Sequence, residues 1–446
     1  VGEYVQAFMP ADYQARTCVL LHGRMFYLQE NGNNAMSSPI EIALSDGKGT
    51  IHGYCDEKFR SVLETFVANF EDREEQGASI CFNVDGETVV DLWGGRMHPR
   101  QESDWQEDTM SVVHSVTKAA VSICAHILIC EGKLDLQAKV VDYWPEFGQQ
   151  GKDDVSVAMM LNHSAGLAAI RTPIKEGGFL DWDYMVQRLA EEAPFWKPGT
   201  RNGYHMSTFG WTVGELVRRA SGLSLGDYFR TRVAEPLGLD FYIGLPESEH
   251  HRVSRMMRWA PKKEDLVSPY TVALLQSKES LQYIALLNNG KFKTDAPESY
   301  LCEYGAGGGI ANGKGIAGMF KPFANGGEGF VDKVALERMQ AASVATNEDV
   351  TLVSPTKFSL GFMLSMDNRH REAGALETII MGKHAFGHAG AGGSVGFADT
   401  ECHLGFGYSM NKMGAGILLN ERGQSLVDET YRCLGYSTNE PGYWVK

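Results

Sequence analysis

Several serines in this sequence stand in patterns that could make a serine hydroxyl a nucleophile. Ser394 lies in the G-x-S-x-G pattern of residues 392–396, which is typical of a strained strand-to-helix turn that presents a catalytic serine. The other pattern is S-x-x-K, in which a lysine one helical turn on accepts the serine proton if burial and the helix dipole keep its amine neutral. This pattern occurs at Ser45/Lys48, Ser115/Lys118, Ser354/Lys357 and Ser409/Lys412.

The residues that follow Ser394 do not favour the strand-to-helix turn. The sequence continues VGFADTECHLGFGYSM, which alternates like strand, turn and strand, and no helix begins there. In that type of site the catalytic histidine comes after an acidic residue and far along the chain, whereas the only histidine beyond Ser394 is His403, nine residues on. We therefore predict that the glycines allow two strands to turn and that Ser394 is not the nucleophile.

Local context separates the four S-x-x-K pairs. Ser45 lies in an SDGKG turn, Ser354 is followed by proline, and Ser409 ends a strand-like run. Only Ser115 begins a long apolar segment, residues 115–130, which is apolar almost all round and predicts a buried helix. Ser115 is therefore the best candidate, although a serine at this position could also be a simple N-cap of the helix.

The elements that must position these residues come from both ends of the chain. Apolar residues recur at helical spacing over 59–70, and two strand-like runs follow at 78–84 and 87–95. Later strand-like runs and a closing amphipathic helix are predicted at 358–365, 377–390, 394–399, 403–410 and 421–434. We predict one α/β domain with a central antiparallel sheet, built from residues 51–135 and 351–446. A mainly helical inserted domain, 136–350, interrupts it, and residues 1–50 form an extension of unknown role.

The composition is that of an ordinary globular protein. The chain has 446 residues, 43% of them hydrophobic, and a formal net charge of −15. No Lys/Arg run is present, so nucleic-acid binding is not expected. The eight cysteines are scattered without a C-x-x-C pair, which favours reduced thiols. No apolar run reaches the ~18 residues of a membrane helix and no signal peptide is visible, so we expect no membrane association and a cytoplasmic location.

Five segments in order resemble a known superfamily. They are HSVTK (114–118), LNHSAGL (161–167), PGTRNGYHMSTFGWTVGELVRRASG (198–222), FGHAGAGGSVGFAD (386–399) and GFGYSMNKMG (405–414). Together they resemble the serine β-lactamase and penicillin-binding-protein superfamily, and are most similar to the class C β-lactamase-like carboxylesterases called family VIII. The resemblance runs from about residue 56 to the end of the chain. It implies an α+β fold of the β-lactamase/transpeptidase type, with an antiparallel sheet flanked by helices and an inserted mainly helical domain.

The resemblance also implies roles for single residues. Ser115 corresponds to the nucleophile, Lys118 to its proton partner and Tyr204 to a tyrosine that relays a proton to the leaving group, with its phenolate favoured by a lysine ammonium. Backbone N–H groups of Ser115 and Ala391 would form the oxyanion hole. His388 and Gly390 would lie on the strand that lines the site and contact substrate, and the glycines around them would let this strand approach it closely.

Two departures from the family pattern bear on the substrate. Met206 stands where β-lactamases carry an asparagine, and His388 stands where they carry a lysine. Losing an amide and a permanent cation weakens recognition of a β-lactam, so we expect a serine carboxylesterase that hydrolyses short-chain esters through an acyl-serine. The alternatives are a β-lactamase or D-amino-acid peptidase, an acyltransferase, and a non-catalytic binding protein of the same fold. Trp144 and Tyr204 are expected to shape the acyl pocket.

Two rival sites have weaker support in the sequence. Residues 308–314 read G-x-x-x-x-G-K, but Gly315 follows where a nucleotide site needs serine or threonine, and the segment does not look like a strand that opens a helix. His384 and His388 have a metal-binding spacing only on a helix, whereas their segment resembles a strand and a turn. We therefore expect no metal and no cofactor, and a small-molecule ester as the partner.

Overall fold

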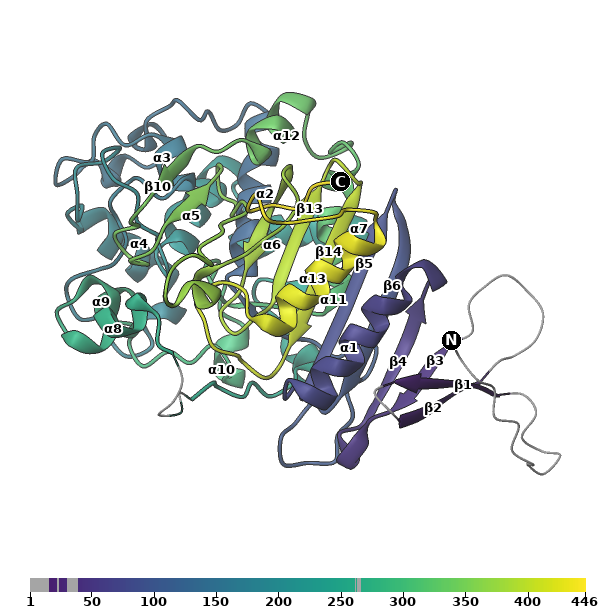
Figure 1. The fold of residues 1–446 in the computed structure, drawn as a ribbon. Helices are drawn as coiled ribbons and strands as arrows, with labels where there is room; N and C mark the ends of the chain where they lie inside the picture. Colours follow the sequence, from purple (N-terminus) through teal and green to yellow (C-terminus); the bar gives the residue numbers. More distant parts are fainter. Residues whose placement is uncertain (1–15, 22–23, 30–38, 261, 263–265) are drawn as a thin grey trace, which may run out of the picture.

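Strands from opposite ends of the chain form one antiparallel sheet. The computed structural model describes residues 16–21, 24–29, 39–260, 262 and 266–446. The sheet has seven strands in the order β12-β13-β14-β5-β6-β4-β3, and each neighbouring pair is antiparallel (Figure 1). The strands are β3 Ile40–Ala43, β4 Thr50–Cys55, β5 Gly77–Val84, β6 Glu87–Gly95, β12 Ala385–Ala389, β13 Val395–Asp399 and β14 Leu404–Met410. Because β14 pairs with β5, the late strands continue the sheet that the early hairpin begins.

Glycines on β13 and β14 create a flat surface for a helix. Gly396 and Gly407 face each other across the two strands. A Cβ on Gly396 would lie 2.3 Å from a side-chain atom of Ile316, and a Cβ on Gly407 would lie 2.3 Å from the Gly313 carbonyl oxygen. Helix α11 (Gly313–Ala324) therefore packs directly on this face, because no side chain separates it from the strands.

Aromatic side chains cover the other face of the same strands. Phe397 and Phe406 pair across β13 and β14, and Phe397 stacks on Tyr431 with ring centroids 6.2 Å apart. Tyr431 belongs to α13 (Glu421–Cys433), which lies beside α1 (Arg60–Asp72) across this face (Figure 1). Both helices, the early hairpin and the two strands confirm the sequence predictions for these segments.

A second, small sheet positions the start of the long buried helix. It has the order β7-β9-β8, with β7 Ser111–His114, β8 Phe241–Tyr242 and β9 Gly309–Ala311. Strand β7 leads directly into α2 (Val116–Cys130), in which residues 116–128 are buried. The predicted buried helix is thus confirmed, and its first turn is fixed by residues nearly 200 positions later in the chain, since β7 pairs with β9.

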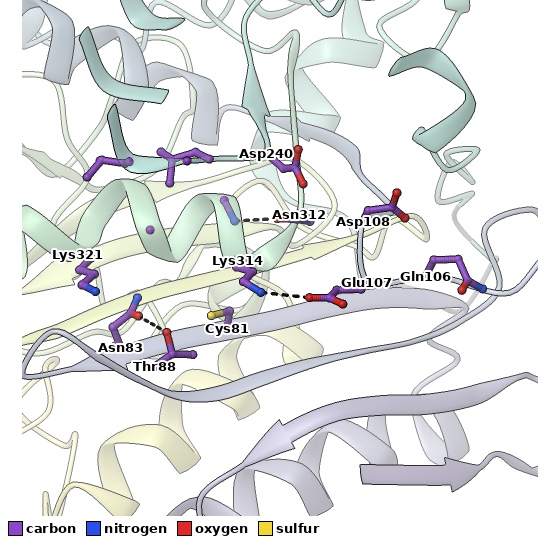
Figure 2. A pocket seen from close by; sticks show the side chains of 15 residues that line it. Cys81, Asn83, Thr88, Gln106, Glu107, Asp108, Asp240, Asn312, Lys314 and Lys321 are labelled. Carbon is purple, nitrogen blue, oxygen red and sulfur yellow. Dashed lines mark hydrogen bonds and ion pairs between the residues drawn. The ribbon is translucent and has the colours of Figure 1, made fainter. Parts of the chain in front are cut away.

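The G-x-x-x-x-G-K segment has a different structure from the predicted one. Strand β9 leads into α11, so the segment is a strand that opens a helix, and the prediction on this point is wrong. Lys314 does not face an open phosphate site, because its Nζ lies 3.0 Å from Asp91 and 3.2 Å from Glu107. Lys314 and Glu107 line a pocket of about 600 Å³ whose wall also carries Asp108 and Asp240 (Figure 2). Its acidic side chains do not favour a nucleotide.

Residues 136–350 carry most of the remaining helices. These are α3 Val157–Leu161, α4 Trp182–Glu191, α5 Phe209–Ser221, α6 Leu225–Phe229, α7 Glu235–Leu237, α8 Pro269–Gln276, α9 Leu281–Leu287, α10 Pro297–Tyr300 and α12 Lys333–Gln340. Two further hairpins are β1 Arg16–Leu21 with β2 Arg24–Gln29, and β10 Val344–Thr346 with β11 Thr356–Phe358.

The packing of the elements differs from the predicted domain limits at two places. Helix α11 packs on the main sheet, and the limit at residue 50 falls at the start of β4, whose partner β3 precedes it. The division into domains stays a prediction.

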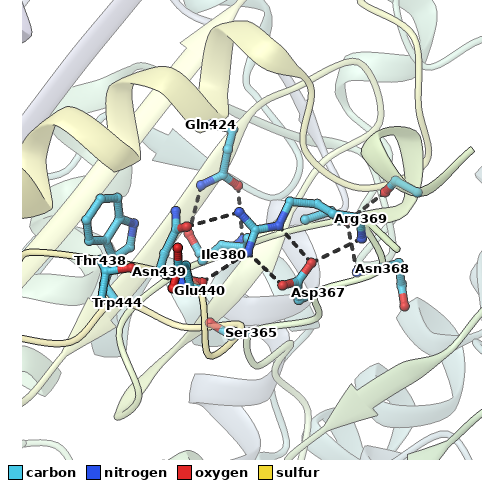
Figure 3. Close-up of polar contacts among 12 residues, drawn as sticks. Ser365, Asp367, Asn368, Arg369, Ile380, Gln424, Thr438, Asn439, Glu440 and Trp444 are labelled. Atoms are coloured by element: carbon cyan, nitrogen blue, oxygen red, sulfur yellow. Dashed lines mark hydrogen bonds and ion pairs between the residues drawn. The ribbon is translucent and has the colours of Figure 1, made fainter. Parts of the chain in front are cut away.

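The end of the chain is held against the segment that precedes β12. Arg369 donates to both carboxylate oxygens of Asp367 and to the side-chain and backbone oxygens of Asn439 (Figure 3). Trp444 donates its backbone N–H to the Met381 carbonyl. The tail is therefore part of the packed structure around the sheet edge.

The run 358–365 is not the strand that its sequence pattern predicts. Strand β11 ends at Phe358, and the chain then turns at Gly361, which has φ of +95°. A Cβ on Gly361 would lie 2.2 Å from the Ser122 hydroxyl oxygen, and that hydroxyl donates to the Gly361 carbonyl at 2.9 Å. Contact with α2 therefore bends a segment whose alternation favours a strand.

Candidate active site

Ser115 lies at the junction of β7 and α2, half-buried, with a strained residue before it. His114 has φ of +46°, an unusual conformation for a residue with a side chain and one that is found at functional sites. Ser115 takes the N-cap position of α2, but its hydroxyl caps no backbone N–H. The alternative that Ser115 is a simple N-cap is therefore wrong, and its hydroxyl is available for another contact.

That contact is with Lys118, one turn further along α2. The Lys118 Nζ lies 3.2 Å from the Ser115 Oγ, 2.8 Å from the Met206 carbonyl oxygen and 2.6 Å from the Ala306 carbonyl oxygen. The lysine side chain is fully buried, and burial lowers its pKa well below the ordinary value. Desolvation is the only resolved cause of this shift, so no carboxylate offsets it.

The partners of Lys118 fit a neutral amine. A neutral amine has two N–H donors and one lone pair, and two of its three neighbours are carbonyl oxygens, which only accept. The two N–H groups are therefore taken by Met206 and Ala306. In the neutral form the lone pair faces Ser115, whose hydroxyl is the one neighbour with a proton to give, whereas in the ammonium form Nζ donates to the Ser115 Oγ.

Tyr204, from the segment 198–222 that resembles the family, is the third residue beside Ser115 and Lys118. The side chain is buried, and its ring lies under the Lys118 Nζ at 4.8 Å from the ring centroid. Burial raises the pKa of the phenol, and a hydrogen bond with Ser115 opposes that rise. Burial thus raises the pKa of the phenol and lowers that of the amine, which favours the uncharged form of both groups in the resting site. The expectation of a phenolate favoured by an ammonium stays a prediction.

His388 supports Tyr204 and is shielded from solvent. Its Nδ1 lies 2.7 Å from the carbonyl oxygen of Ala389, so this nitrogen carries the proton and Nε2 carries the lone pair. Nε2 lies 3.4 Å from the Tyr204 hydroxyl, which is the donor in this contact. Burial, with the nearby Lys118, lowers the pKa of His388 to about 3, so the imidazole is neutral at pH 7. The contact of His388 is thus with the phenol, while direct contact with substrate stays a prediction.

The turn between β12 and β13 is held against the strand that ends at Ser115. Ser394 is buried, and its hydroxyl donates to the Val113 carbonyl at 2.9 Å. A Cβ on Gly390 would lie 2.3 Å from the same carbonyl oxygen, and the Gly390 N–H is already bonded to the Ser394 carbonyl at 2.7 Å. Gly390 therefore accommodates neighbouring protein atoms, and its contact with substrate stays a prediction. Ala391 at the tip of the turn is exposed.

All four S-x-x-K pairs lie within the described residues, and only one brings its hydroxyl and amine together. The Ser45 hydroxyl bonds Glu71, and the Ser409 hydroxyl bonds Ser79. The Ser354 hydroxyl is buried without a hydrogen-bond partner. Ser115 alone donates toward, or accepts from, its lysine. The geometry therefore agrees with the choice of Ser115 and with the exclusion of Ser394.

Two features of this site carry no signal in the sequence, and one residue expected to shape the acyl pocket lies elsewhere. The carbonyl groups of Met206 and Ala306 bind Lys118 through backbone atoms, which any residue type supplies. Asp349 accepts a hydrogen bond from the Tyr204 backbone N–H and lies in no recognisable motif. Trp144, expected at an acyl pocket, is instead buried in the apolar core, where its ring packs on Phe147 with centroids 5.0 Å apart.

Comparison with known proteins places the chain in a family. A family model described as Beta-lactamase matches residues 59–425. The chain belongs to the beta-lactamase family. Among solved structures, a family VIII carboxylesterase has a TM-score of 0.75 at 36% identity, covering 86% of this chain and 99% of its own. A penicillin-binding protein homologue from Caulobacter crescentus has a TM-score of 0.75 at 31% identity, with the same coverage. The esterase/beta-lactamase LipL of Mycobacterium tuberculosis is 28% identical over 386 residues, 84% of this chain and 86% of that protein.

Membership of the beta-lactamase family confirms two of the predictions. The fold is an α+β fold of the β-lactamase/transpeptidase type, and the chain is a serine hydrolase.

In the described residues, no helix is long and apolar enough to cross a membrane, and no three His, Cys, Asp or Glu side chains are grouped to hold a metal ion. His384 is exposed whereas His388 is buried, so the two do not share a site. The cytoplasmic location stays a prediction.

Proposed function

We propose that this member of the beta-lactamase family is a carboxylesterase that hydrolyses short-chain esters through an acyl intermediate on Ser115. The observation that carries the proposal is the state of Lys118. A fully buried lysine with no carboxylate partner, two carbonyl acceptors and one hydroxyl neighbour is a base directed at that hydroxyl. The names of two relatives, a family VIII carboxylesterase and an esterase/beta-lactamase, support ester substrates.

The proposed acylation uses groups in contact with one another. Lys118 takes the Ser115 proton as Oγ attacks the ester carbonyl, and the ammonium that forms lies beside the Tyr204 ring. Tyr204 then gives its phenol proton to the departing alcohol oxygen, and the neighbouring ammonium stabilises the phenolate that results. The proton on Lys118 restores the phenol. Water repeats these steps on the acyl-serine and releases the acid.

The backbone supplies two free donors for the tetrahedral oxyanion. Within the described residues, neither the Ser115 N–H nor the Ala391 N–H donates to another protein group. The bond from Ser394 to Val113 fixes the turn that carries Ala391 against the strand that ends beside Ser115. Donors held in place in this way favour stabilisation of charge that develops in the transition state.

The charge around Ser115 supports esters over β-lactams. A β-lactam presents a carboxylate, which is best held by a permanent cation. His388 occupies the position where the family pattern has lysine, and with a pKa of about 3 it supplies no positive charge at pH 7. Met206 contributes a backbone carbonyl to Lys118 and a thioether to the Tyr270 hydroxyl, in place of an asparagine amide.

Covalent labelling followed by turnover measurements tests the proposal. A fluorophosphonate probe should modify Ser115, as mapped by mass spectrometry after digestion. Wild type and Ser394→Ala should hydrolyse 4-nitrophenyl butyrate, whereas Ser115→Ala should lose both label and turnover. Nitrocefin, measured in parallel, should be cleaved far more slowly than the ester.

Each other outcome overturns a defined part of the proposal. Labelling at Ser394 would identify Ser394 as the nucleophile in place of Ser115. Faster cleavage of nitrocefin than of the ester would change the substrate class to β-lactams. Absence of both labelling and turnover in the wild type would reject the enzyme mechanism altogether.

A further inference from the structure

Asp349 is a buried carboxylate that contacts no cation among the described residues. Its side chain is fully buried in the segment between β10 and β11, and burial raises its pKa to about 6. Buried carboxylates are costly unless they are paired with a cation or fully hydrogen-bonded. The partners of Asp349 are three backbone N–H groups and one hydroxyl: those of Tyr204, Thr351, Leu352 and Thr356.

One of these bonds connects Asp349 to the candidate active site. The Tyr204 N–H lies 2.9 Å from Oδ1 and 3.1 Å from Oδ2 of Asp349, 145 positions away in the sequence. The bonds to Thr351 and Leu352 are local and close the turn in which Asp349 lies. The carboxylate therefore joins a short turn to the backbone of the residue whose phenol lies beside Lys118.

The same segment holds Tyr204 at two further points. The Val350 N–H donates to the Asn202 carbonyl at 3.0 Å, two residues before Tyr204. The ring of Tyr204 stacks on Phe358 of β11, with centroids 5.8 Å apart and an angle of 7°. Backbone and ring are thus both held from residues 349–358, while the hydroxyl contacts His388 and Ser115.

We infer that Asp349 is a positioning residue for the hydrolysis, which fixes the backbone of Tyr204 so that the phenol stays within reach of Ser115. The inference rests on the proposed function, since it assigns a role in the reaction of Ser115. Displacement of a catalytic group by 1 Å costs about 100-fold in rate, so loss of this bond affects turnover more than binding.

The test compares Asp349→Asn with a matched control in the full chain. Asp399 is also a buried aspartate, and it accepts hydrogen bonds from the Tyr431 hydroxyl at 2.7 Å and the Glu401 N–H at 2.9 Å. Asp399→Asn therefore has a comparable structural cost at the end of β13. We expect Asp349→Asn to lower kcat for 4-nitrophenyl butyrate about 10- to 100-fold, with KM changed less than about twofold. Asp399→Asn should keep kcat within about twofold at a similar loss of Tm.

A double-mutant cycle separates positioning from general destabilisation. If Asp349 acts through the Tyr204 hydroxyl, Asp349→Asn should lower kcat by less than about threefold in a Tyr204→Phe background. Equal loss of kcat in Asp349→Asn and Asp399→Asn, or full additivity in the cycle, would overturn the inference. Should Asp349→Asn fail to fold, Thr356→Val removes one hydroxyl that is shared between Asp349 and the side-chain oxygen of Asn202, and it is measured in the same cycle, with a smaller and again non-additive loss expected.

The two proposals fail in different ways. If wild type neither takes the fluorophosphonate label at Ser115 nor hydrolyses the ester, the proposed function is rejected and the role of Asp349 falls with it. If wild type does both and Asp349→Asn behaves like Asp399→Asn, only the role of Asp349 is rejected.

Discussion

Two fully buried lysines in this protein have almost the same surroundings. Lys152 donates to the carbonyls of Ala190 and Glu192 at 2.9 and 2.6 Å, and lies 5.1 Å from the ring centroid of Phe147. Lys118 likewise has two carbonyl partners and lies 4.8 Å from the ring centroid of Tyr204. Burial lowers the pKa of both lysines, that of Lys152 to about 8.

The two lysines differ in the other groups that surround each amine. Lys118 has the Ser115 hydroxyl as its third partner, and its aromatic neighbour carries a hydroxyl. Lys152 has the Glu192 carboxylate nearby, which raises its pKa against the effect of burial, and its aromatic neighbour is a phenylalanine. A buried lysine with carbonyl acceptors is therefore a structural element on its own. A hydroxyl to deprotonate and the absence of an acid make it a base.

The largest expected difference in kcat is between variants that remove Lys118 and Lys152. Lys118→Met should lower kcat for 4-nitrophenyl butyrate by about 10³- to 10⁴-fold, because the general base is lost. Lys152→Met should keep kcat within about twofold, because no reacting group touches Lys152. Steady-state kinetics on the folded variants measures both. Equal losses would mean that the comparison does not distinguish a base from a structural lysine.

Tyr204→Phe makes the surroundings of Lys118 more like those of Lys152. The ring that covers the amine remains, and only the hydroxyl is removed. We expect kcat to fall about 100-fold with little change in Tm, since a proton donor is lost from a preserved core. Stopped-flow measurement of the nitrophenol burst shows whether acylation is the slowed step. Wild-type kcat in this variant would remove Tyr204 from the mechanism.

A smaller effect is expected from the residue behind Tyr204. His388→Leu removes the acceptor of the phenol and should lower kcat about tenfold, which corresponds to one hydrogen bond of about 1.4 kcal/mol. His388→Gln restores an acceptor and should recover part of the loss. A change in KM without a change in kcat would instead support the predicted contact of His388 with substrate.

The smallest expected effect is the contribution of Lys152 to the pH dependence of the free energy of unfolding. The pKa of Lys152 is about 8 in the folded protein against an ordinary value of 10.5, so between these values only the unfolded chain holds the proton. The free energy of unfolding should therefore rise with pH across this window, by at most ~1.4 kcal/mol per pH unit, and Lys152 should add no pH dependence below pH 8, where both states hold the proton. Urea denaturation at pH 7.5 and 10 should show a smaller gain in Lys152→Met. An unchanged gain would mean that Lys152 is charged in the folded protein throughout.

Short-range patterns were sufficient for many elements of the fold. The helices α1, α2 and α13 and the strands β5, β6, β13 and β14 follow from apolar residues at a period of 3.6 or 2. The run 358–365 was predicted wrongly because the Ser122 hydroxyl holds Gly361 in a turn, a contact between distant residues. The strand and helix at 309–324 were missed because their glycines are selected by close packing against other backbone, which weakens the local signal.

Sequence alone is enough to identify the pair Ser115 and Lys118, because a spacing of three residues on a helix places both side chains on one face whatever surrounds them. It also determined the family, through motifs that occur in order. The lowered pKa of Lys118 depends on the tertiary structure, since its carbonyl partners lie 88 and 188 positions away and burial is a property of the whole core. The bond from Asp349 to Tyr204 likewise depends on a fold that brings residues 145 positions apart into contact. Local spacing fixes which groups are available, and long-range packing fixes their charge and geometry.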